Sequence, residues 1–184
     1  MYFDTVERQD WITCLEDVVT EANNQPHLVH PDKFAWTFNA KADAMNLWEH
    51  CVGWYDANGH IMGAIVVRHN KRQPVANLQL LHTFNKHRRK GVGRVLTEHQ
   101  FEESYKSGMK YFRVSAEIDA VPFYKALGFK FWGEQKSGCQ LSIFKIGGPT
   151  IAEGQYDIED PIINRAIYTK ARGGLVKVFE GGPC

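Results

Sequence analysis

The sequence predicts a mixed α/β fold, with a mostly antiparallel central sheet flanked by helices. Three observations lead to this fold class. The 184 residues are about one domain long, 43% of them are hydrophobic, and strand and helix patterns alternate along the first 146 residues. After Gly147-Gly148-Pro149 the composition changes. We therefore expect one domain over residues 1–146 and a C-terminal extension of unknown role over 147–184.

The N-terminal part predicts one short strand and two helices. Residues 2–6 are strand-like, and an amphipathic helix is expected over 8–22 because apolar side chains recur there at helical spacing. These apolar positions are Trp11, Ile12, Leu15, Val18 and Val19. A second helix is expected over 31–49.

The middle of the chain predicts a hairpin and a buried strand. Residues 51–55 and 60–69 are strand-like and flank the turn sequence Asp56-Ala57-Asn58-Gly59. Residues 77–84, with the sequence NLQLLHTF, are apolar on both faces, as expected of a strand in the middle of a covered sheet.

The segment after Gly91 is predicted to be a helix that ends at Ser107-Gly108. Its hydrophobic pattern is mixed, because Val92 and Leu96 share one face while Tyr105 falls on another. The elements expected after it are a strand over 111–115, a helix over 121–127 closed by Gly128, strands over 129–132 and 140–146, a weak helix over 161–170 and a strand over 175–179.

Charge and cysteine content exclude several classes of function. Lys plus Arg number 22 and Asp plus Glu 21, so a net charge of +1 argues against nucleic acid as a partner. The N-terminus lacks the order of a signal peptide, and no apolar run is long enough to cross a bilayer. We expect a soluble, cytoplasmic protein without a membrane partner. The four cysteines show no CxxC spacing, so we expect reduced thiols and neither a metal site nor a disulfide framework.

The run Arg88-Arg89-Lys90-Gly91-Val92-Gly93 stands between the buried strand and the following helix. Free backbone N–H groups and the positive end of the helix dipole meet at such a junction and attract an anion. The glycines let a phosphate approach the backbone, and the cations add charge-assisted hydrogen bonds. Arg94-Val95 follows where a mononucleotide P-loop needs Lys-Ser/Thr, and a third glycine of the dinucleotide fingerprint is missing.

This run resembles the R/Q-x-x-G-x-G/A motif of the GCN5-related N-acetyltransferases (GNAT). A second segment, 120-AVPFYKALGF-129, resembles the A-x-x-x-Y-x-x-x-GF signature of the same family. The two motifs stand in the family's order, and the resemblance covers residues 1 to about 146. It implies a GNAT-like fold and an acyltransferase that uses acetyl-CoA as cosubstrate and acetylates a primary amine of a small molecule, peptide or protein by direct transfer.

The resemblance also implies which residues bind acetyl-CoA. The backbone of the central strand would bind the pantetheine arm, and the loop with its cations would bind the phosphates. Carried over by position, the cofactor-binding residues are Leu81, His82, Thr83, Arg88, Arg89, Lys90, Gly91, Val92, Gly93 and Arg94.

The resemblance implies one catalytic residue, and a second is a candidate because it lies close by on the central strand. Tyr124 matches the tyrosine that protonates the leaving thiolate; otherwise it is a packing aromatic beside Phe123 and Phe129. The base is less clear, because the matching positions on the central strand hold Asn77 and Gln79. His82 is one candidate, although strand alternation places it on the opposite face from Gln79. Ordered water or Glu117 are the others.

Several alternatives stay open at the level of sequence. The missing carboxylate on the central strand also suits a non-catalytic acyl-CoA-binding or regulatory module. Residues 147–184 either cover the acceptor side or join a partner subunit, as in a homodimer. The tryptophans that either line an acceptor pocket or belong to the core are Trp36, Trp48, Trp54 and Trp132.

Overall fold

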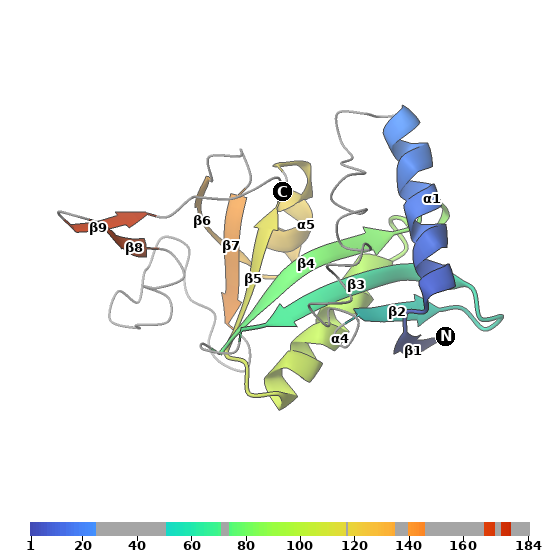
Figure 1. Cartoon of the computed structure of the whole chain (residues 1–184), viewed down its shortest axis with the longest axis horizontal. Helices are drawn as coiled ribbons and strands as arrows, with labels where there is room; N and C mark the ends of the chain where they lie inside the picture. The colour runs from blue at the N-terminus through green and yellow to red at the C-terminus, as the bar shows by residue number, and fades with distance from the viewer. Residues whose placement is uncertain are drawn as a thin grey trace. The chain divides into compact units, whose positions relative to one another are not determined.

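The computed structural model describes residues 1–24, 51–70, 74–116, 118–134, 140–145, 168–171 and 174–177. The chain forms two compact units, one from Met1–Arg68 with Leu78–Glu103 and one from His69–Asn77 with Ser104–Cys184. Seven strands form one sheet in the order β1-β2-β3-β4-β5-β7-β6 (Figure 1). The expected helix over 31–49 lies outside the described residues.

The first unit opens with three antiparallel strands. These are β1 (Tyr2–Thr5), β2 (Cys51–Tyr55) and β3 (Ile61–His69). Asp56 closes the turn between β2 and β3, because its Oδ1 accepts hydrogen bonds from the N–H groups of Asn58 at 2.8 Å and His60 at 3.0 Å. The predicted strand near the N-terminus and the predicted hairpin are both confirmed.

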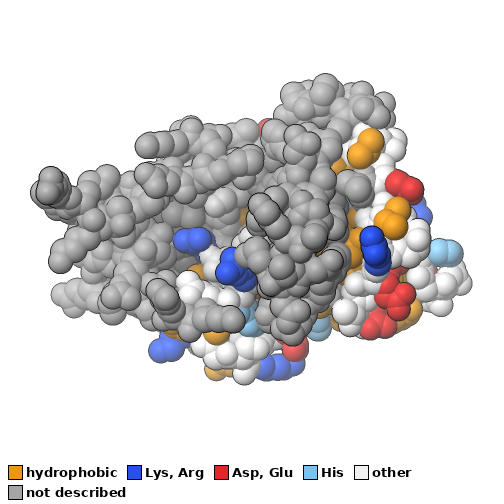
Figure 2. Space-filling view, viewed as in Figure 1, with side chains coloured by type: hydrophobic (Ala, Val, Ile, Leu, Met, Phe, Trp, Pro, Cys, Tyr) orange, Lys and Arg blue, Asp and Glu red, His pale blue; other side chains and the backbone are white. Residues whose placement is uncertain are grey.

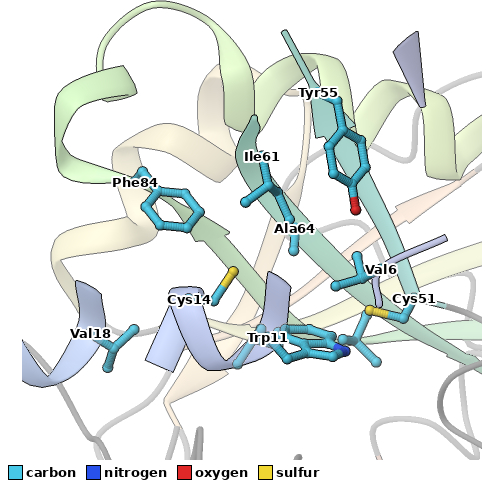
Figure 3. Close-up of a cluster of buried hydrophobic side chains, with 11 residues drawn as sticks. Val6, Trp11, Cys14, Val18, Cys51, Tyr55, Ile61, Ala64 and Phe84 are labelled. Carbon is cyan, nitrogen blue, oxygen red and sulfur yellow. The ribbon is translucent and has the colours of Figure 1, made fainter. Parts of the chain in front are cut away.

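Helix α1 (Arg8–Asn24) packs one face against β2, β3 and β4. Trp11, Cys14 and Val18 are each at most 2% exposed and meet strand side chains in one cluster (Figure 3). The helix is confirmed, but the prediction that its apolar face includes Ile12 and Val19 is wrong. Ile12 and Val19 are 42% and 41% exposed, since the buried face runs through Cys14 and Glu21 instead.

Strand β4 (Val75–Thr83) shows regular alternation from Leu78 onward, with Leu78, Leu80 and His82 buried and the residues between them half-buried. Leu80 belongs to the cluster beneath α1. The even-numbered side chains of this part of the strand therefore face α1. The short helix η2 (Asn85–His87) follows and leads into the glycine loop.

Helix α4 (Val92–Lys106) approaches the strands closely at Gly63. A Cβ added at Gly63 would lie 2.7 Å from the His82 carbonyl oxygen and 2.9 Å from Val92 Cγ1, so a larger residue would clash there. The mixed hydrophobic pattern of this helix has a physical cause. Its buried face carries polar residues beside Val92 and Leu96, namely Thr97, Gln100 and Ser104.

The second unit contains β5 (Tyr111–Ala116), η3 (Ile118–Ala120), α5 (Val121–Ala126), β6 (Lys130–Glu134) and β7 (Gln140–Lys145). Gly128 ends α5 with a φ of 89°, as expected. Strands β5 and β6 both pair antiparallel with β7, whereas β4 and β5 are parallel. The mixed, mostly antiparallel sheet predicted from sequence is confirmed.

Residues 168–177 contain a hairpin of β8 (Tyr168–Ala171) and β9 (Gly174–Lys177). The expected strand over 175–179 is thus confirmed in part. The helix expected over 161–170 is wrong from Tyr168 onward, because these residues pair with β9 and include the strand formers Tyr and Thr. Among the described residues no helix has the length and apolarity to span a membrane.

Candidate active site

The glycine loop turns sharply between η2 and α4. The Arg88 N–H donates to the Asn85 carbonyl at 3.2 Å, and two residues then adopt left-handed backbone conformations. These are Arg89, with a φ of 59°, and Gly91, with a φ of 83°. Left-handed residues in such a turn bring successive N–H groups to one side and create an anion-binding concavity.

The first turn of α4 adds further donors to this loop. The first helical hydrogen bond runs from the Val95 N–H to the Gly91 carbonyl at 3.0 Å. The N–H groups of Val92, Gly93 and Arg94 precede it and have no acceptor within the helix. A Cβ added at Gly91 would meet nothing within 4 Å, so the space beside this backbone is open.

Three cations of the loop are available to an anion. Lys86, Arg89 and Lys90 are exposed, and no described carboxylate pairs with any of them. Arg94 is also exposed but lies 3.4 Å from Glu98 on the same helix. On the face shown in Figure 2, the described Lys and Arg side chains lie scattered among acidic and apolar ones. Because the whole chain has a net charge of only +1, the positive charge of the loop is local.

Arg88 has a different environment from the other cations. Its guanidinium forms a bidentate ion pair with Glu21 of α1, and its Nε donates to the Thr83 carbonyl at 3.2 Å. Glu21 is buried, whereas the Arg88 side chain is 43% exposed. Contact of Arg88 with a phosphate stays a prediction; in the structure it ties the loop to α1.

Among the described residues, β5 pairs with only the first part of β4. The β4–β5 ladder covers only three residue pairs and ends at Asn77 and Arg113. Beyond that point the Phe84 N–H donates to the Met62 carbonyl of β3 at 3.2 Å. Because backbone groups alternate between the two edges of a strand, those of Leu81 and Thr83 point to the edge away from β3.

His82 is held by a carboxylate from α1. Its Nε2 lies 3.0 Å from Asp17 Oδ2, and the residue is 4% exposed. Partial burial alone would raise the pKa of the Asp17 carboxyl. The hydrogen bond and charge of His82, an Asn85 N–H and the charge of Arg88 outweigh it and lower this pKa below its ordinary value of 3.8. As expected from alternation, His82 and Gln79 lie on opposite faces of β4.

Tyr124 lies in a group of aromatic rings in the second unit. The residue is 7% exposed, and its ring packs edge to face against that of Phe129, with the ring centroids 5.3 Å apart. The ring of Phe129 also packs against that of Phe112 on β5, with the ring centroids 6.2 Å apart. The packing environment expected around Tyr124 is thus present, and its role as an acid stays a prediction.

The other residues considered from sequence fall in different places. Trp54 stacks on Phe3 of β1, at the edge of the sheet, with the ring centroids 6.2 Å apart. Trp132 belongs to β6, while Trp36, Trp48 and Glu117 lie outside the described residues. Within the described ranges no three His, Cys, Asp or Glu side chains are grouped as a metal would require.

Two residues with clear roles at this site escaped the sequence analysis. Asp17 and Glu21 lie one helical turn apart, at the spacing that Cys14 and Val18 set for the buried face of α1. Carboxylates on a buried helix face need cationic or hydrogen-bonding partners. The spacing of Asp17 and Glu21 along the buried face of α1 is therefore the sequence signal that predicts their role.

Comparison with known proteins agrees with this geometry. The domain described as "Acetyltransferase (GNAT) domain" matches residues 20–144. The chain therefore belongs to the GNAT acetyltransferases, as its two motifs predicted. This confirms the resemblance, and with it acetyl transfer as the general activity and acetyl-CoA as the cosubstrate. No curated protein matches the sequence.

Solved structures show the same fold. PaiA N-acetyltransferase from Thermoplasma acidophilum, in complex with coenzyme A, has a TM-score of 0.62 at 15% identity, covering 78% of this chain and 98% of that one. An aminoglycoside 6′-N-acetyltransferase complexed with coenzyme A has a TM-score of 0.58 at 13% identity, and the match covers 81% of this chain and 99% of that one. Tetrahymena GCN5 has a TM-score of 0.58 at 16% identity, and the match covers 79% of this chain and 96% of that one. At these identities the likeness concerns the fold alone.

Proposed function

We propose that this protein is an N-acetyltransferase that moves the acetyl group of acetyl-CoA to a primary amine of a small molecule, peptide or protein by direct transfer. The observation that carries the proposal is the loop from Arg88 to Gly93. Its left-handed residues, the N–H groups that have no acceptor within α4, and Arg89 and Lys90, with which no described carboxylate pairs, provide what a diphosphate needs.

The neighbouring strand supports the same proposal. A pantetheine arm carries amide groups, and these need backbone partners. Leu81 and Thr83 direct their backbone groups to the edge of β4 where the ladder with β5 has ended. The Thr83 carbonyl already accepts from Arg88, so we propose that Leu81 makes the main contact with the arm.

The chemistry requires transfer of one acetyl group and movement of two protons. The amine nitrogen attacks the thioester carbon, the C–S bond breaks, and the thiolate must receive a proton while the amine loses one. We propose that the Tyr124 hydroxyl donates the proton to the thiolate. A phenol is protonated at neutral pH and serves as a donor at short range.

For the proton of the amine we propose His82, acting directly or through water. An imidazole oriented by a carboxylate is a common arrangement for a general base, and Asp17 supplies that carboxylate at 3.0 Å. Asn77 and Gln79 on the same strand have no basic group at neutral pH.

The experiment uses the two glycines that flank α4, one before its first residue and one beyond its last, because they share the same backbone strain. Gly91 and Gly108 have φ values of +83° and +81°, and a Cβ at either position meets nothing within 4 Å. Alanine at each costs about 1–2 kcal/mol of backbone strain. Only Gly91→Ala places a methyl group beside the phosphate loop, so only this variant should weaken acetyl-CoA binding, by about tenfold or more in Kd.

The readout is the melting temperature of each variant titrated with acetyl-CoA, together with amide formation across a panel of amines. Ligand at 100 times Kd should stabilise the wild type by about 2.7 kcal/mol. Equal loss of affinity in both glycine variants, or no binding by the wild type, would overturn the proposal. Binding without acetylation of any amine would instead indicate a non-catalytic acyl-CoA-binding module.

A further inference from the structure

Arg113 is a partly buried cation, and none of the residues that the structure describes supplies a counter-charge to it. It lies in the middle of β5, and its neighbours across the sheet are Asn77 of β4 and Ile143 of β7, which are both uncharged. Among the described residues no carboxylate pairs with it. Burial lowers the pKa of its guanidinium below the ordinary value of 12.5, without any offsetting charge.

Such a residue is costly to the fold. Removing a guanidinium from water without a carboxylate or hydrogen-bond partner destabilises the folded state. An apolar or neutral side chain of similar length would cost less. A cation kept in this environment is typical of a site where an anion binds and supplies the missing charge.

The position of Arg113 relates it to the reaction. It is the last residue of β5 that pairs with β4, so it marks the point where the ladder ends. The side chains of Phe112 and Arg113 point to opposite faces of β5, because side chains alternate along a strand. Phe112 contacts Phe129, which contacts Tyr124, so the guanidinium lies on the face of β5 away from that aromatic group.

We infer that Arg113 binds an anionic group, a carboxylate or a phosphate, of the amine that accepts the acetyl group. This inference rests on the proposed function and deepens it, because it assigns the acceptor to anionic amines. The fork of Arg113 can form two parallel hydrogen bonds to one carboxylate, which would fix the orientation of the acceptor.

The test compares matched acceptors that differ in one anionic group. The pairs are L-lysine with L-lysinamide, which tests a carboxylate, and O-phosphoethanolamine with ethanolamine, which tests a phosphate. In the wild type, the anionic member of at least one pair should have a kcat/KM about tenfold or more above its neutral partner. Arg113→Gln should abolish this difference, and Arg113→Lys should keep part of it.

Two further measurements separate this inference from the proposed function. The Kd for acetyl-CoA should be unchanged in Arg113→Gln, since loss of cofactor binding would mean that Arg113 serves the cofactor and would overturn the inference. Lys110→Gln removes a charge from an exposed position beside β5 and should leave the discrimination intact. Equal discrimination between the anionic and neutral acceptors by the wild type and Arg113→Gln would also overturn the inference.

A binding readout covers the case in which no tested amine is acetylated. With coenzyme A present at saturation, the anionic member of a pair should raise the melting temperature of the wild type more than the neutral member does. This excess should vanish in Arg113→Gln. Without ligand, Arg113→Gln should melt at or above the temperature of the wild type, because the substitution removes an unpaired buried charge. If the excess were the same in both proteins, the inference would fail whatever the activity.

Discussion

The guanidinium of Arg88 and the carboxylate of Glu21 form a bidentate ion pair that ties the phosphate loop to helix α1. Glu21 is 7% exposed, so its charge is largely removed from water and needs a partner. Arg88 also bonds to the Thr83 carbonyl at the end of β4. One side chain thus links the helix, the strand and the loop, and we interpret it as a support for the conformation of the loop.

This support predicts strong energetic coupling between Glu21 and Arg88. In a double-mutant cycle with Glu21→Gln and Arg88→Gln, each single change should cost about 1–3 kcal/mol of unfolding free energy, with a coupling energy above about 1 kcal/mol. Urea denaturation of the four proteins gives these values.

The exposed pair Arg94 and Glu98, 3.4 Å apart on α4, is the matched control. Its side chains are 50% and 54% exposed, so the same cycle should give a coupling energy of at most about 0.5 kcal/mol. Equal coupling in the two cycles would show that the Glu21 pair has no special role in the loop.

The contact between Asp17 and His82 predicts a dependence of stability on pH. The pKa of the Asp17 carboxyl is lowered in the folded protein, so its contribution is present above pH 3.8 and is lost as the pH falls through the folded value. Asp17→Asn should therefore melt below the wild type at pH 7, and the difference should shrink below pH 3.8. Glu16→Gln, an exposed neighbour with the same charge change, should show little difference at either pH.

Substitution of the proposed acid has a specific expected result. Tyr124→Phe keeps the ring that packs against Phe129 and removes only the hydroxyl group. We expect kcat to fall about 100-fold or more, with an unchanged Kd for acetyl-CoA. Tyr105→Phe, on the exposed surface of α4, should keep full activity. Full activity of Tyr124→Phe would assign this tyrosine to packing alone.

The sequence predicted the elements whose local signals agree with their packing. The loop and the second motif were recognisable because glycine and proline fix backbone conformation through nearest neighbours. In the same way, Gly91, Gly108 and Gly128 all adopt the left-handed conformation that a loop or helix end requires. Strand β4 was evident because leucines stand at both even and odd positions, Leu78, Leu80 and Leu81, as in a strand covered on both sides.

Partners distant in the sequence were not predictable in this way. Glu21 and Arg88 are 67 residues apart, and only the packing of α1 on the sheet brings them together. Arg113 appeared to be an ordinary strand residue, because its burial without a counter-charge depends on neighbours from other strands. The exposure of Ile12 and Val19 was missed for a related reason, since the periodic pattern of α1 also fits a face shifted by one residue.

The last prediction concerns His87, in the helical turn just before the loop. Partial burial and the charges of Lys86 and Lys90 lower the pKa of its imidazole below the ordinary 6.5, although Asp56 acts in the opposite direction. A diphosphate bound beside Lys90 would offset these cations and raise the pKa again. Binding of coenzyme A near pH 6.5 should therefore take up protons.

Calorimetric titrations in buffers of different ionisation enthalpy measure this uptake. The number of protons taken up by the wild type should exceed that of His87→Gln, which has no imidazole at this position. His60→Gln is the control, because His60 is exposed and pairs with Asp56 in the β2–β3 turn. It should behave as the wild type. Identical uptake in all three proteins would show that no anion binds close enough to the loop to act on His87, and it would remove support from the phosphate site itself.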